Sequence, residues 1–432
     1  MLVGGVPAVA DQGVPDDQPL PGYIINNPPL PPVVVGGRPT KVLQGVYRHS
    51  AYIVEVPAKW NGRLAMWAHG YRGTGTVLTV DPPNYDLRSH LLNEGYAWAA
   101  SSYYDNGYDV RAGVTATRDL ALRFNTLVAR PKKVLIAGVS MGGHIIGRSL
   151  EQYPGFYAGA LPMCGAIGDQ QLFDYFLSYN VTAQTLSGID AYPPGPDYVT
   201  KVVPQIEAKL GLTNLTPGGP DTVTPEGAQL RAITVNLTGG DRPGATAGFA
   251  YWKDFLFSLA APAPPGADPG RVATNLFTLY RPNSPVDVNR QVRRIAPRDW
   301  VARFSPALTD VARIDGRPTV PVLSLHGLGD MFVPFVMEQE YRADVARNGR
   351  TNLLVQRAIR TVNHCEFSPP EAASAWDDLV TWVDHGPRPA GDVIDNPAVV
   401  ARPDYGCRFT DPTAYNGPGT RKLFAPCPPA TH

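Results

Sequence analysis

The chain has no excess of charge of either sign and no long hydrophobic run. Its 432 residues carry 38 basic and 38 acidic side chains, so the formal net charge is +0. Nucleic acid is therefore an improbable partner, because a surface that follows phosphates needs clustered Lys and Arg. No stretch reaches the roughly 18 apolar residues that a membrane-spanning helix requires. We expect a protein without a membrane span that binds no nucleic acid.

Cysteine is scarce, and its placement is informative. Cys407 and Cys427 lie in a C-terminal tail rich in Gly and Pro that has little core of its own. We hypothesise a Cys407–Cys427 disulfide and therefore an oxidising compartment, secreted or periplasmic.

Residues 1–10 are apolar but lack a basic start and run into an acidic, proline-rich stretch, so they make a poor signal peptide. If the protein is exported, we expect that its signal has been removed.

Proline is abundant, with 45 residues, about twice its usual share of roughly 5%. The chain is also longer than the roughly 250 to 300 residues at which a single hydrophobic core stops growing. We therefore predict a core with proline-rich additions. The prediction divides the chain into an extended N-terminal arm at 1–40, a core at 41–166 and 318–390, a mostly helical cap at 167–317 and a tail at 391–432.

Strand and helix patterns alternate through the predicted core, which indicates a mainly parallel, doubly wound α/β sheet covered on both faces. The run 134–139 is continuously apolar and of strand length, as expected for a buried central strand. The other predicted strands are 52–56, 64–68, 96–101, 158–164, 320–325 and 353–358. The predicted helices are 87–93, 115–128, 334–347 and 369–383, with further helical patches in the cap at 172–179, 202–210 and 249–259.

The sharpest motif is Gly138-Val139-Ser140-Met141-Gly142, between the buried strand and a helical pattern. A tight strand-to-helix turn brings backbones too close for a Cβ, which accounts for the glycines, and it lifts the serine hydroxyl to the carboxyl edge of the sheet. Ser140 is the predicted nucleophile.

A serine hydroxyl needs a base and an orienting carboxylate. Asp330 follows the strand 320–325, and His364 follows the next strand signal, so the chain order is Ser, Asp, His. We predict Asp330 as the acid and His364 as the base. Asp169 and Asp174, at the start of the cap, are rival acids.

These motifs resemble the α/β-hydrolases, in particular secreted serine esterases with a large cap. The resemblance implies the α/β-hydrolase fold over residues 51–384. It also implies an oxyanion hole made by the backbone N–H groups of Met141 and, in the loop after the strand 64–68, of Tyr71.

A partial likeness to tannases and feruloyl esterases concerns the cysteines. In those enzymes a cysteine before the serine bonds a cysteine after the histidine. Cys365 matches the second position, whereas Val139 occupies the first. Cys164, at the end of the next strand, could approach Cys365 instead, and the sequence leaves this pairing open.

Several other residues have competing interpretations. Tyr103 and Tyr104 follow a strand end near the serine and are candidates for a substrate-binding aromatic wall, although tyrosines on loops often only cover a core edge. We expect His144 to pack structurally, His326 to serve its strand–loop turn, His69 to brace the oxyanion loop and Glu366 to form local hydrogen bonds.

No cysteine, histidine or acidic cluster has metal-ligand spacing and no phosphate-binding loop is evident, so we predict chemistry without metal or cofactor.

The sequence therefore predicts a serine hydrolase of carboxylic esters, with aryl, short-chain and polymeric esters all open as substrates. One alternative is a serine exopeptidase of the same fold. Another is a non-catalytic binding protein on a hydrolase scaffold.

Overall fold

A computed structural model describes residues 13–260, 268–282 and 287–427 of the chain. The apolar N-terminal run at 1–10 and the proline-rich run at 261–266 lie outside the described residues. Within the described ranges, no helix is long and apolar enough to cross a membrane.

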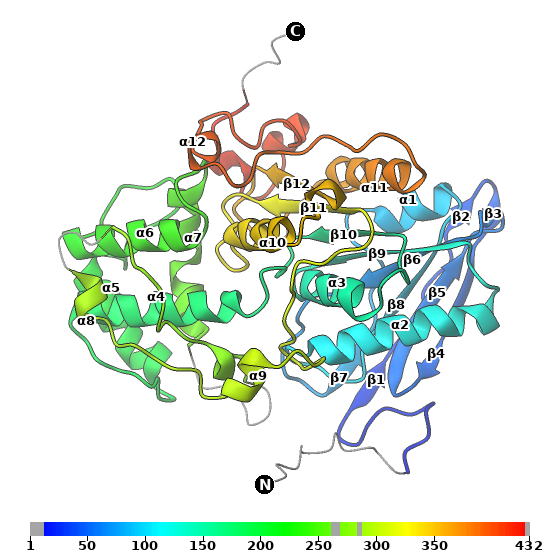
Figure 1. The fold of residues 1–432 in the computed structure, drawn as a ribbon, viewed down its shortest axis with the longest axis horizontal. Coiled ribbons are helices and arrows are strands. Elements are labelled where there is room, and N and C mark those ends of the chain that lie inside the picture. The colour runs from blue at the N-terminus through cyan, green and yellow to red at the C-terminus, as the bar shows by residue number, and fades with distance from the viewer. Residues whose placement is uncertain (1–12, 261–267, 283–286, 428–432) are drawn as a thin grey trace.

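The centre of the molecule is an eight-stranded sheet with the order β12-β11-β10-β9-β6-β8-β5-β4 (Figure 1). Strand β5 is antiparallel to both neighbours, and the other neighbouring strands are parallel. The parallel strands therefore deliver their carboxyl ends to one edge. The strands are β4 Lys41–Tyr47, β5 Ser50–Val56, β6 Arg63–Ala68, β8 Ala97–Ser101, β9 Lys133–Val139, β10 Gly159–Met163, β11 Val322–Gly327 and β12 Leu354–Ile359.

Helices cover both faces of this sheet. Along β6, Leu64 and Met66 pack toward α2, α3 and α10, whereas Ala65 and Trp67 pack toward α1 and α11. This alternation is the one expected of a strand buried on both sides. The helices are α1 Leu87–Asn93, α2 Val110–Leu127, α3 Met141–Gln152, α10 Val336–Arg347 and α11 Pro369–Val383. The predicted doubly wound α/β class is confirmed.

Most predicted elements lie within a few residues of the observed ones, and helices 87–93 and 369–383 have the predicted bounds. The helix predicted at 115–128 begins earlier, at Val110, because the Asp109 carboxylate caps it by accepting the Ala112 N–H. Strand β4 was not predicted. It lies at the edge of the sheet and all its residues are exposed or half-buried, so its hydrophobic signal is weak.

Between β10 and β11 the described chain is mainly helical. Figure 1 shows these helices grouped beside the sheet. Their hydrophobic core is continuous with Leu328, Met331 and Val362, which belong to the loops after β11 and β12. The helices are α4 Gln171–Ser187, α5 Val203–Leu210, α6 Pro225–Leu237, α7 Ala245–Ser258, α8 Val288–Gln291 and α9 Trp300–Phe304. Helices α6, α8 and α9 have no counterpart among the predicted helices.

The two terminal segments pack on the core. In the N-terminal segment, β1 (Ile24–Asn26) pairs with β7 (Val77–Thr79), and β2 (Val34–Val35) pairs with β3 (Arg38–Pro39). The C-terminal segment contains α12 (Pro397–Val400) and 3₁₀ turns at Pro412–Asn416 and Arg421–Leu423, and it is closed by the predicted Cys407–Cys427 disulfide.

Candidate active site

Ser140 occupies a sharp turn between β9 and α3. Its backbone has φ 57° and ψ −122°, a strained conformation for a residue with a side chain. A Cβ at Gly138 or at Gly142 would lie 2.3 or 2.2 Å from the Ala68 carbonyl oxygen at the end of β6. The two glycines are therefore required by the close approach of β6, as the motif predicts.

The structure brings Ser140, His364 and Asp330 together from three loops. The Ser140 hydroxyl lies 2.8 Å from His364 Nε2, and His364 Nδ1 lies 2.5 Å from Asp330 Oδ2. Asp330 is fully buried, whereas the Ser140 and His364 side chains keep a small exposed fraction. The order of contacts is the one in which a base can take the serine proton while a carboxylate orients the base.

The Asp330 carboxylate is held by its own turn. Its Oδ1 accepts the N–H groups of Phe332 and Val333, at 2.9 and 3.1 Å. His326 Nε2 in turn lies 2.8 Å from the Val333 carbonyl oxygen. Burial lowers the pKa of His326, but the nearby Glu338 carboxylate outweighs it and the net shift is upward. His326 thus serves the strand–loop turn, as expected.

Both rival acids are engaged elsewhere. Asp169 accepts the Ile314 N–H at 2.8 Å, which ties the start of the helical segment to its end, and burial raises the Asp169 pKa to about 7. Asp174 forms a bidentate ion pair with Arg303, at 2.7 Å for both contacts. Neither contacts His364, so the geometry favours Asp330.

The predicted oxyanion residues flank the serine. Met141 is the first residue of α3, where backbone N–H groups point out of the helix. A Cβ at Gly70 would lie 3.5 Å from Ser140 Oγ, so the loop after β6 passes directly beside the hydroxyl. Tyr71 follows Gly70 and exposes 45% of its surface. Its assignment as the second donor stays a prediction.

Tyr103 and Tyr104, the candidates for an aromatic wall, differ in burial and in what they contact. Tyr103 is buried and stacks on His69 with ring centroids 3.9 Å apart, and its hydroxyl donates to the His69 carbonyl at 3.1 Å. It therefore supports the loop that follows β6. Tyr104 is half-buried against the core face that α2 and α3 cover, and burial raises its pKa to about 12.

Two histidines near the serine have structural partners. Burial lowers the pKa of His69 to about 3, and its ring nitrogens face the Gly70 and Ser102 carbonyls. His144 lies between the Tyr108 hydroxyl at 2.9 Å and the Ala312 carbonyl at 2.5 Å, and burial lowers its pKa to about 4. A neutral imidazole has one N–H, so His144 can accept the Tyr108 hydroxyl and donate to Ala312, whereas neutral His69 can donate to only one of its two carbonyls. Both rings brace the structure.

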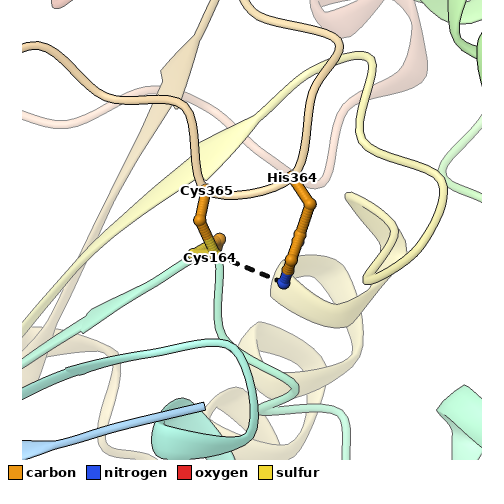
Figure 2. Close-up of side chains that lie close together, drawn as sticks. All are labelled: Cys164, His364 and Cys365. Atoms are coloured by element: carbon orange, nitrogen blue, oxygen red, sulfur yellow. Dashed lines mark hydrogen bonds between the residues drawn. A yellow bond between two sulfur atoms is a disulfide. The ribbon is translucent and has the colours of Figure 1, made fainter. Parts of the chain in front are cut away.

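Cys365 is disulfide-bonded to Cys164 at the end of β10 (Figure 2). The pairing left open by the sequence is therefore present, and it joins the loop of His364 to the sheet. Cys365 Sγ lies 3.2 Å from His364 Nε2. Although Cys164, Cys365 and His364 lie close enough to hold a metal ion, both sulfurs are in the disulfide and Nε2 contacts Ser140. The oxidised cluster does not fit a metal site.

The sequence did not predict an aromatic cluster that contacts His364, the predicted base. The Phe332 ring meets the His364 ring edge-on, with centroids 4.9 Å apart. Phe176 of α4 stacks on Phe332 at 6.1 Å, and Phe255 of α7, 39% exposed, contacts it edge-on at 4.8 Å. Phe332 stands two residues after Asp330, which could have flagged it, whereas nothing in the sequence orients Phe176 or Phe255 toward it.

The strand order with its single antiparallel member, together with the serine turn after β9, defines the α/β-hydrolase fold. The predicted resemblance is thus confirmed at the level of fold.

No known protein-family description matches the chain. The o-phthalyl amidase of Xanthobacter agilis is 22% identical over 416 residues, covering 83% of this chain and 90% of that protein. Among solved structures, an esterase from Aspergillus oryzae has a TM-score of 0.49 and 14% identity, with 88% and 86% of the two chains covered. Feruloyl esterase B from the same organism has a TM-score of 0.42 and 16% identity, with 82% of each chain covered.

Proposed function

We propose that the protein is a serine hydrolase of carboxylic esters. The observation that carries the proposal is the continuous contact from Ser140 through His364 to buried Asp330. Ser140 attacks the ester carbonyl while His364 accepts its proton, and His364 then delivers that proton to the leaving alkoxide. Asp330 orients the imidazole and stabilises its charged form. Water, activated by His364, releases the acyl group from Ser140.

The negative charge that develops on the carbonyl oxygen needs donors beside Ser140. We assign this role to the Met141 N–H and the Tyr71 N–H, because α3 begins at Met141 and the loop after β6 passes beside the hydroxyl. Each such donor contributes about 3 kcal/mol to lowering the barrier. Tyr103, beneath this loop, supports its backbone.

The aromatic cluster favours an aryl group in the substrate among the ester classes that the sequence left open. Phe332 contacts His364, and Phe255 presents a partly exposed ring beside Phe332. Aromatic rings attract further rings in edge-on or offset arrangements, worth about 0.5 to 1.5 kcal/mol beyond burial. The residues come from the Asp330 loop and from the segment 167–317, which we propose is the cap.

Amide hydrolysis is a second candidate. The same triad cleaves amides, and the relative at 22% identity is named an o-phthalyl amidase, a hydrolase of an aromatic acyl amide by its name. The two disulfides support a secreted or periplasmic location, because disulfides persist in oxidising compartments.

The test is Ser140→Ala against a panel of acetyl and benzoyl esters and matched amides. We expect Ser140→Ala to lower kcat by at least about 10⁴-fold, as loss of a nucleophile does. Ser149→Ala, on the same helix, is the matched control and retains activity. The wild-type protein should favour benzoyl over acetyl esters. Turnover retained in Ser140→Ala, at unchanged thermal stability, would refute the proposal.

A further inference from the structure

The C-terminal tail contacts the loop that carries His364. The hydroxyl of Thr420 accepts the N–H groups of Val362 and Asn363, each at 2.9 Å. The same hydroxyl donates to Glu366 Oε2 at 2.5 Å, and the Thr420 N–H donates to Glu366 Oε1 at 3.0 Å. Thr420 therefore binds residues on both sides of His364, and it does so in a site where only 8% of its own surface is exposed.

Glu366 completes this arrangement. Its Oε2 also accepts the Thr361 hydroxyl at 2.8 Å, so one carboxylate joins the start and the end of the loop to Thr420. A Cβ at Gly419 would lie 2.2 Å from Glu366 Oε1, and Gly419 has φ +115°. The tail backbone thus approaches the carboxylate as closely as only glycine allows. Glu366 does not contact His364 directly, so it belongs to the support of the loop.

Neighbouring contacts hold Thr420 in place. The Arg421 guanidinium forms a buried bidentate ion pair with Glu371 in the first turn of α11, at 2.7 and 2.6 Å, and also donates to the Glu366 carbonyl at 3.0 Å. The Cys407–Cys427 disulfide closes the segment that contains both tail residues. An ordered buried ion pair and a covalent closure limit the movement of Thr420.

We propose that Thr420 is a positioning residue for the base, and that the closed tail is a working part of the active site. This inference rests on the proposed function. The loop of residues 360–368 is neither helix nor strand, so its own backbone ladder does not fix the imidazole. Hydrogen bonds to Val362 and Asn363 set the position from which His364 reaches both Ser140 and Asp330. A displacement of about 1 Å at such a group can lower the rate as much as 10²-fold.

The first test compares Thr420→Val, which keeps the shape but removes the hydroxyl, with Thr420→Ser, which keeps the hydroxyl. Thr413→Val is the matched control, because Thr413 lies in the same tail and bonds only its neighbour Asp411 among the contacts found for its side chain. We expect Thr420→Val to lower kcat by about 10-fold or more, within the range for a misplaced group, with KM within about twofold. Thr420→Ser should restore most of kcat, and Thr413→Val should match wild type. A folded Thr420→Val protein with wild-type kcat would overturn the inference.

Hydrogen exchange of residues 361–366 in the same variants measures the loop without any substrate. Faster exchange in Thr420→Val, but not in Thr420→Ser, supports the inference, and unchanged exchange overturns it. A wild-type protein that hydrolyses no ester would refute the proposed function. The exchange measurement would still test whether Thr420 holds the loop, because it needs no substrate. If Thr420→Val does not fold, the double variant Cys407→Ser/Cys427→Ser tests the inference in its place. Faster exchange of residues 361–366 in that variant supports the role of the tail, and exchange at the wild-type rate overturns it.

Discussion

The serine and the histidine of the proposed triad are held in place in different ways. The Ser140 turn is held by the sheet strands beside it. Its two glycines lie against Ala68 of β6, and the Ser140 N–H donates to the Met163 carbonyl of β10 at 3.1 Å. The His364 loop is held by segments distant in sequence, among them the three that follow. Cys164 joins it through the disulfide, Trp252 of α7 donates to the Val362 carbonyl at 2.9 Å, and Thr420 binds it from the tail.

This difference shows why additions to the fold can matter for catalysis. The nucleophile depends on a rigid strand–turn–helix unit, which the core alone supplies. The base depends on the sheet, the helical segment and the tail at once. The helical segment between β10 and β11 and the C-terminal tail therefore both contribute to the placement of His364.

The double variant Cys164→Ser/Cys365→Ser tests how the His364 loop is held, and we expect it to have the largest effect on stability. The disulfide closes a sequence separation of 201 residues. Its removal should lower the free energy of unfolding by about 2 to 5 kcal/mol and lower kcat, because the His364 loop gains freedom. Thermal unfolding and ester turnover of the folded fraction measure the two effects. Wild-type kcat in the variant would contradict a role for the bridge in placing the base.

The serine side is tested by Gly142→Ala. The new Cβ would meet the Ala68 carbonyl at 2.2 Å, so the strand–helix turn must shift. We expect a loss of about 1 to 3 kcal/mol in unfolding free energy, together with reduced activity. Gly75→Ala is the control, because nothing lies within 4 Å of a Cβ built there. Equal stability of the two variants in denaturant unfolding would show that the turn is less constrained than its geometry indicates.

The smallest effect concerns Asp169, beside the serine turn. Burial raises its pKa to about 7, so between pH 4 and 7 the native state binds a proton that the unfolded chain has released. The native state binds more protons in that window, and its stability from this group falls as the pH rises. Relative to wild type, Asp169→Asn should gain stability by about 1 kcal/mol per pH unit through that window.

Denaturant unfolding of both proteins at pH 5 and pH 6.5 measures this change. Because Asp169 does not contact His364, Asp169→Asn should keep kcat near that of wild type. A fall in kcat comparable with that of Asp330→Asn would instead revive Asp169 as the acid.

The elements of the core could be predicted because each one carries its own pattern. The apolar run 134–139 and the paired glycines around Ser140 required no partner to be recognised. Edge strand β4 was missed because none of its residues is buried. The sequence left Tyr103 open between an aromatic wall and a core cover, because its stacking partner His69 belongs to another loop. The aromatic cluster and the Thr420 contacts join residues remote in sequence, for which no local pattern exists.

By itself, the sequence determined the mainly parallel α/β sheet, the serine turn and the order of Ser140, Asp330 and His364, since strand–turn–helix periodicity and steric limits at glycine act over a few residues. Only the tertiary structure decided which acid meets the histidine, which cysteine pairs with Cys365 and what holds the histidine loop. Those outcomes depend on hydrogen bonds and packing between segments that meet only when the whole chain has folded.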